Sequence, residues 1–109
     1  MPPGVDPGVA SRLKSVSLSR NQSDVLRVRS VHEVLGDDAA AALTALSEAM
    51  ELAGFRAGKA GSRPNGALTA TFGKKGYGVI RVIARDGAGE RPTGNDVTAL
   101  LTVDFPVRQ

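Results

Sequence analysis

The sequence predicts an α+β domain: an antiparallel β-meander of three to four strands with one main α-helix, at about residues 37–53, packed on one face. Two observations support this fold class. Residues 37–53 combine helix-forming residues with helical spacing, and three later stretches alternate apolar and polar residues between turns. A chain of 109 residues suits one domain, which we expect over residues 11–109.

The N-terminal third is the least determined part of the chain. Residues 1–10 hold three Pro and two Gly, which predicts a flexible leader or linker. Residues 11–20 alternate weakly, which is typical of a short edge strand or an extended tail. Residues 23–35 fit both templates, because four Val favour a strand while an apolar helical stripe ends at Gly36. We expect a short helix there.

Residues 37–53 give the strongest element prediction. Asp37 or Asp38 is placed to cap the helix, and Gly54 is placed to end it in a left-handed conformation. Phe55 then folds back on the last turn. The expected apolar stripe recurs at steps of three and four and consists of Ala39, Leu43, Leu46, Met50 and Ala53.

The second half reads as strands and turns. Phe55 and Ala57 are placed to begin a strand, but the glycines and Pro64 of residues 58–65 predict a loop. Residues 67–73 and 77–85 alternate around a Lys74-Lys75-Gly76 turn and form a hairpin. Residues 86–96 form a loop. A third strand follows, with these residues facing inward: Val97, Ala99, Leu101, Val103 and Phe105.

Composition excludes several classes of site. The chain has no Cys and one His, so disulfides, thiol catalysis and multi-His metal sites are excluded. No apolar run approaches the length of a membrane span of about 20 residues. The N-terminus lacks the pattern of a signal peptide, so we expect a cytoplasmic protein, or an exported one whose targeting segment has been removed.

Charge is distributed unevenly along the chain. The formal net charge is +3, yet residues 54–85 carry seven Lys and Arg and no Asp or Glu. The flanking residues 24–53 and 86–109 are both net acidic. Such asymmetry favours an anionic partner, although an acidic helix and a basic hairpin also complement each other within one fold.

The Gly73-Lys74-Lys75-Gly76 turn has the GxxG form and resembles the signature loop of KH domains, which clamps nucleic-acid backbone. Val79 and Val82 fall at the matching downstream offsets. In KH domains this loop joins two helices, whereas Gly78 and the β-branched run 79–83 favour a strand here. A plain hairpin turn is therefore the interpretation that we adopt.

No pattern predicts catalysis. His32-Glu33 has no identifiable nucleophile as a partner, and Asp37-Asp38 is explained by helix capping, so we expect no enzyme, no cofactor and no metal. Tyr77, Arg81 and Arg85 are predicted to share the open face of one strand.

We therefore expect a non-enzymatic binding or interaction module that contacts a protein or an anionic partner through its basic hairpin and open sheet face. The alternative is a nucleic-acid-binding protein that contacts phosphates through the same residues. The candidate binding residues are Arg56, Lys59, Arg63, Lys74, Lys75, Tyr77, Arg81 and Arg85.

Overall fold

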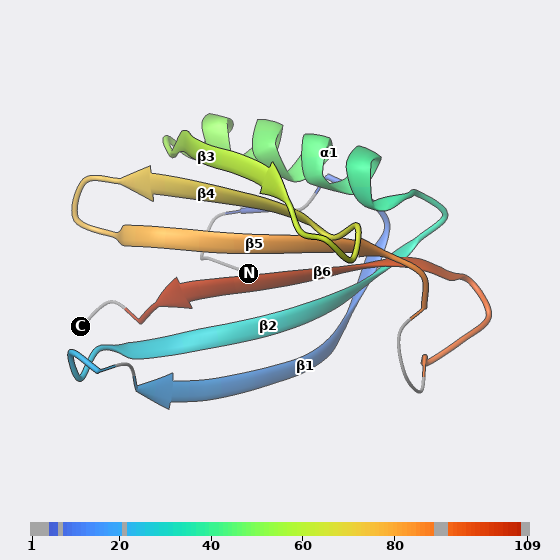
Figure 1. Cartoon of the computed structure of the whole chain (residues 1–109), viewed down its shortest axis with the longest axis horizontal. Helices are drawn as coiled ribbons and strands as arrows, with labels where there is room; N and C mark the ends of the chain where they lie inside the picture. The colour runs from blue at the N-terminus through green and yellow to red at the C-terminus, as the bar shows by residue number, and fades with distance from the viewer. Residues whose placement is uncertain (1–4, 7, 21, 89–91, 108–109) are drawn as a thin grey trace.

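The computed structural model describes residues 5–6, 8–20, 22–88 and 92–107. In these residues the chain forms one helix and a six-stranded antiparallel sheet (Figure 1). The elements are, in chain order, β1 (Ser11–Arg20), β2 (Leu26–Leu35), α1 (Ala39–Leu52), β3 (Arg56–Ser62), β4 (Leu68–Lys74), β5 (Gly78–Asp86) and β6 (Val97–Pro106). The predicted α+β class is confirmed, whereas the predicted three to four strands are too few.

The strands lie in the order β1-β2-β6-β5-β4-β3. The first hairpin, β1–β2, joins the meander β3–β6 through the pairing of β2 with β6. The helix α1 connects β2 to β3 and so carries the chain to the opposite edge of the sheet (Figure 1). As a result β1 and β3 are the two edge strands, and the last strand lies in the interior of the sheet.

The helix is capped at both ends as its sequence predicts. The Asp38 carboxylate accepts a hydrogen bond from the Ala41 backbone N–H at 2.8 Å. Asp86, at the end of β5, accepts another from the Ala39 N–H at 2.8 Å. At the other end Gly54 has a φ of 93°, and the N–H of Phe55 reaches back to the Met50 carbonyl at 2.9 Å. These contacts confirm the predicted start and end of the helix.

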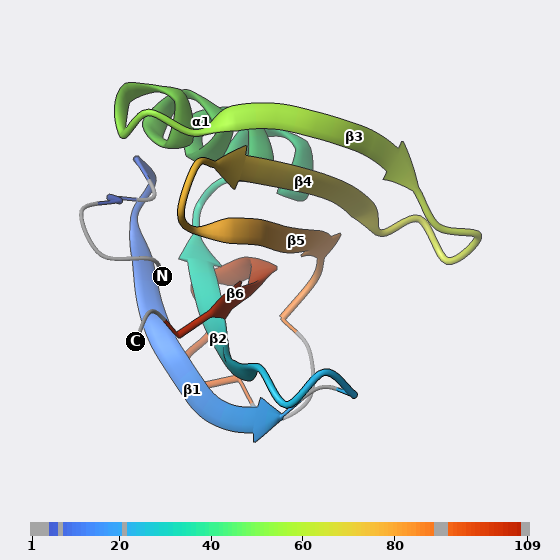
Figure 2. The ribbon, with the colours of Figure 1, turned by 90° about the vertical axis from the view of Figure 1, so that its left-hand side faces the viewer.

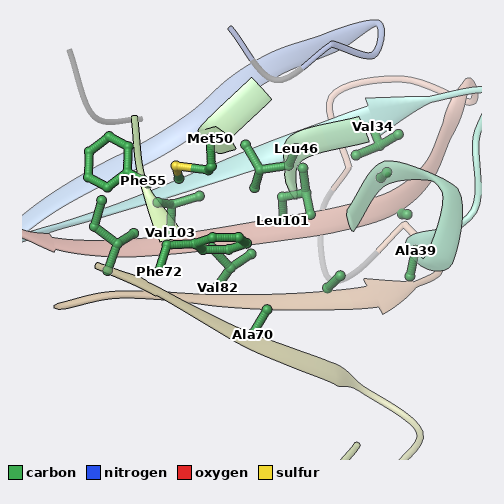
Figure 3. Close-up of a cluster of buried hydrophobic side chains, with 14 residues drawn as sticks. Val34, Ala39, Leu46, Met50, Phe55, Ala70, Phe72, Val82, Leu101 and Val103 are labelled. Carbon is green, nitrogen blue, oxygen red and sulfur yellow. The ribbon is translucent and has the colours of Figure 1, made fainter. Parts of the chain in front are cut away.

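The core lies between α1 and one face of the sheet, which we call the inner face (Figure 3). Leu46 and Met50 project from the helix onto Phe72, Val82 and neighbouring side chains. The inward residues predicted for the last strand are confirmed, since Ala99, Leu101, Val103 and Phe105 are buried or pack against this cluster. Alternate residues of β4 and β5 lie on the same face: Leu68, Ala70, Phe72, Ile80, Val82 and Ala84. Val97 is also buried.

Residues 26–35 form a strand and not the helix that we expected. Strand β2 pairs along its length with β1 on one side and with β6 on the other, so two ladders satisfy its backbone groups. A helix would have satisfied the same groups locally, but it would have left β1 without a partner strand and β6 paired with β5 alone. Gly36, with a φ of 96°, ends a strand rather than a helix.

Residues 56–62 also form a strand, although their glycines predicted a loop. The strand β3 pairs with β4 around a bulge between Ala57 and Ala60. Gly58 is needed there, because a Cβ at this position would lie 2.6 Å from Thr71 Oγ1. The same hydroxyl accepts a hydrogen bond from the Lys59 N–H at 2.9 Å. Gly58 therefore allows strands β3 and β4 to approach closely within the sheet.

The helix covers only part of the inner face. It packs against β3, β4, β5 and β6, and so it covers the half of the sheet that is distant from β1 (Figures 1 and 2). Val5 and Val9 pack at the edge of the core, whereas residues 1–4 and 7 of the predicted leader lie outside the described residues. The inner face of β1 is left open.

Candidate binding groove on the outer face

The strand register brings polar side chains of four strands into rows on the outer face of the sheet, opposite α1. Arg29 on β2 pairs with Asp104 on β6, Asp104 pairs with Arg81 on β5, and Arg81 pairs with Thr71 on β4. Paired residues in antiparallel strands project from the same face, so these four side chains lie side by side. The neighbouring row runs through Thr102, Ile83 and Thr69.

Two adjoining hollows follow these rows. One has a volume of about 250 Å³ and the other about 230 Å³, and both are lined by Arg63, Ile83 and Thr102. Together we call them the outer groove. Its polar side chains are Arg29, Arg63, Asn65, Thr69, Thr71, Arg81, Arg85, Thr102 and Asp104.

The carboxylate in the groove is already neutralised. Asp104 Oδ1 lies 2.5 Å from Arg27 Nε in a largely buried ion pair, and Asp104 Oδ2 lies 3.4 Å from Arg29 Nη2. Arg27 also donates to the Val79 carbonyl at 2.9 Å, which ties β2 to β5 across the end of β6. Asp104 is therefore occupied by the two arginines of β2.

Three other arginines in the groove have no such partner. The side chains of Arg63, Arg81 and Arg85 make no hydrogen bond or ion pair with any described residue. Arg81 and Arg85 lie four residues apart on the same face of β5 and are exposed. Arg63 lies in the turn that follows β3. The groove therefore presents three guanidinium groups beside the hydroxyls of its threonines.

Tyr77 does not lie on this face, and its predicted grouping with Arg81 and Arg85 is wrong. It belongs to the turn before β5 and packs edge-to-face on Phe55, with ring centroids 5.5 Å apart, at the margin of the core. Gly76 and Gly78, on either side of Tyr77, both have positive φ, so the alternation of β5 does not extend back to Tyr77. Alternation predicts side-chain faces only within the strand itself.

The GKKG turn is a hairpin turn between β4 and β5, and not a loop between helices. Lys74 Nζ donates to the Ala53 carbonyl at 2.9 Å, at the C-terminal end of α1. It also lies 5.3 Å from the ring centroids of both Phe55 and Tyr77. This lysine therefore completes the end of the helix.

The predicted basic residues consequently separate into groups. Arg63, Arg81 and Arg85 line the outer groove, whereas Arg56, Lys74 and Lys75 surround a separate open hollow beside Gly54. Lys59 is exposed on the edge strand β3.

Sequence reasoning missed Arg29, Thr102 and Asp104 as parts of the groove. The period-two recurrence of Arg27 and Arg29 within residues 26–35 was the available signal for a strand with a polar face.

Strand β2 carries three buried polar residues outside the groove. Glu33 accepts hydrogen bonds from the side-chain hydroxyl and the backbone N–H of Thr93, the latter at 3.0 Å, and these bonds lower the pKa of Glu33. His32 Nε2 lies 2.9 Å from Ser30 Oγ, and burial lowers the pKa of His32 to about 4. His32 and Glu33 project from opposite faces, since they pair with Leu101 and Leu100 respectively.

In the described part of the chain, no group of three or more His, Asp or Glu side chains could hold a metal ion. Over the same residues, no helix has both the length and the apolar character required to cross a membrane. Comparison with known proteins gives no match to a family model, a curated protein or a solved structure.

Proposed function

We propose that this chain is a non-enzymatic binding module whose outer groove takes an acidic segment of a protein partner. One observation carries the proposal: the guanidinium groups of Arg63, Arg81 and Arg85 gather around adjoining hollows and have no partner among the described residues. A guanidinium binds a carboxylate through two parallel N–H···O hydrogen bonds, which favours this anion over diffuse negative charge.

The rest of the groove suits the same ligand. Thr69 and Thr102 offer hydroxyl groups, while the Ile83 side chain between them offers apolar contact for the methylene groups of Glu or Asp. The groove spans β2, β6, β5 and β4, so an extended segment would cross the strands. Asp104 does not oppose the ligand, because Arg27 and Arg29 already pair with it.

A nucleic acid fits this groove less well. Sequence-tolerant binding of single strands depends on aromatic side chains that stack the bases. No aromatic residue lines the groove, and Tyr77 packs against Phe55 at the margin of the core instead. A nucleic acid would therefore be held in this groove by phosphate contacts to the arginines alone.

The proposal is tested by fluorescence anisotropy with a labelled Glu-rich peptide of about ten residues, at about 50 and 200 mM salt. The double variant Arg81→Glu/Arg85→Glu should weaken binding at least roughly tenfold, since it removes two charge-assisted contacts. The control variant Arg56→Glu/Lys75→Glu changes the net charge equally at the separate hollow and should weaken binding much less.

Three results would contradict the proposal. The first is the absence of peptide binding at the lower salt concentration, and the second is an equal loss of peptide affinity in both double variants. The third is tighter binding of single- or double-stranded DNA than of a peptide of similar length. The last result would support the nucleic-acid alternative. Unfolding curves of both variants should match that of the parent chain, because the four substituted residues have exposed side chains.

A further inference from the structure

The free edge of β1 is a second surface, separate from the outer groove. Strand β1 pairs with β2 on one side and has no strand neighbour on the other among the described residues. Its side chains alternate: Ser15, Ser17 and Ser19 lie on the outer face, and Val16 and Leu18 lie on the inner face. Val16 and Leu18 are 55% and 64% exposed.

The two edges of the sheet differ in how they are protected. Proteins commonly guard edge strands with charges, bulges, prolines or short length. The edge strand β3 has a bulge, a lysine and two glycines within seven residues, and Pro64 follows it shortly after. Strand β1 has ten residues and a single irregularity near Lys14, beyond which Ser15–Ser19 is regular and uncharged. This segment therefore offers an unguarded row of backbone hydrogen-bonding groups.

Basic residues flank this segment on both sides, with Lys14 directly before Ser15 and Arg20 directly after Ser19. Arg12 Nη2 lies 2.8 Å from Asp96 Oδ1, and Arg20 Nη1 lies 3.6 Å from Asp24 Oδ1. A strand that approaches the edge between these two pairs meets no unpaired charge at Ser15–Ser19. The requirements for an added strand are thus an uncharged segment and an alternation that matches serines with serines and apolar residues with apolar residues.

We infer that β1 pairs with β1 of a second copy of this chain, antiparallel and about a two-fold axis at Ser17. In this register Val16 of each copy lies opposite Leu18 of the other, and Ser15 lies opposite Ser19. Within Ser15–Ser19 every pair is matched in character, which is the requirement for a two-fold interface. The same register sets Lys14 of each copy against Arg20 of the other, whose guanidinium group is paired with Asp24. The paired apolar side chains shield one another on the inner face.

The inference is tested by sedimentation velocity of the full chain from about 1 μM to about 1 mM. The mass should rise from one chain to two with concentration. Leu18→Lys places a lysine against Val16 at two symmetric positions and should weaken dimerisation roughly tenfold or more. Leu52→Lys makes the same substitution at a leucine of α1 that is 92% exposed, and it should leave the dimer unchanged.

A double variant tests the register itself. Val16→Glu combined with Leu18→Lys places opposite charges across the axis twice, and it should restore much of the dimerisation lost in Leu18→Lys. Failure of this rescue overturns the register. A chain that stays monomeric at the highest concentration, or a dimer unaffected by Leu18→Lys, overturns the inference and leaves the edge for a strand of another protein.

Discussion

The two halves of the inner face are stabilised in different ways. Under α1, side chains such as Leu46, Phe72 and Leu101 are almost completely buried. On β1, by contrast, Leu13, Val16 and Leu18 are each more than half exposed. The β1–β2 hairpin is therefore held mainly by its ladders and by polar ties to neighbouring strands, whereas the β3–β6 half is held by burial of apolar area.

The largest expected effect is a difference in unfolding free energy between matched substitutions in the two halves. Leu46→Ala should lower the free energy of unfolding by about 3 kcal/mol or more, because it leaves a cavity under the helix. The equivalent Leu18→Ala substitution on β1 should cost less than about 1 kcal/mol, since its side chain is largely solvated already. Urea denaturation measures both. Equal losses would show that the hairpin half is buried as well.

An intermediate effect is expected where the two halves meet. Asp104→Asn removes the carboxylate that Arg27 and Arg29 share, and it leaves the largely buried Arg27 without its anion. We expect a loss of roughly 2 kcal/mol in urea denaturation. Asp24→Asn removes the partner of an exposed ion pair on the hairpin and should cost less than about 0.5 kcal/mol. A small loss in Asp104→Asn would mean that the ladder alone joins β2 to β6.

A smaller effect should appear as pH falls. The pKa of His32 is about 4 in the folded chain and about 6.5 when unfolded, so the unfolded state binds more protons between these values. Stability should therefore decline from about pH 6.5 downward, by roughly 1–2 kcal/mol at pH 5. Hydrogen exchange should show β1 and β2 losing protection before β4 and β5. The His32→Gln variant should be flat over this range, and a flat parent chain would contradict the expectation.

The elements under α1 are the ones that the sequence predicts best. Asp38 and Gly54 are capping signals that act within a few residues, and the alternation of β4, β5 and β6 reflects one covered and one open face. The secondary structure of residues 26–35 could not be predicted in the same way. Their choice of strand over helix depends on pairing with β6, whose residues lie about 70 positions further along the chain.

The candidate site was predictable only within one strand. Alternation correctly placed Arg81 and Arg85 opposite the helix. It failed for Tyr77, which lies in the turn, and it did not bring Arg29 and Asp104 into the candidate site. These two residues come beside Arg81 through the order and register of β2, β6 and β5, which no local pattern specifies.

The position of β6 between β2 and β5 also has a consequence for how the chain folds. Arg27 and Asp104 are 77 residues apart, and many other contacts between the hairpin and the meander span similar distances. Contacts of this range slow folding, because a long loop must close before they form. During synthesis the β1–β2 hairpin emerges first but has no neighbouring strand until residues 97–106 have been made. Until then the edge of β2 that will pair with β6 is exposed in addition to the free edge of β1. Capture of this hairpin by a chaperone during translation is therefore an expected feature of its biogenesis.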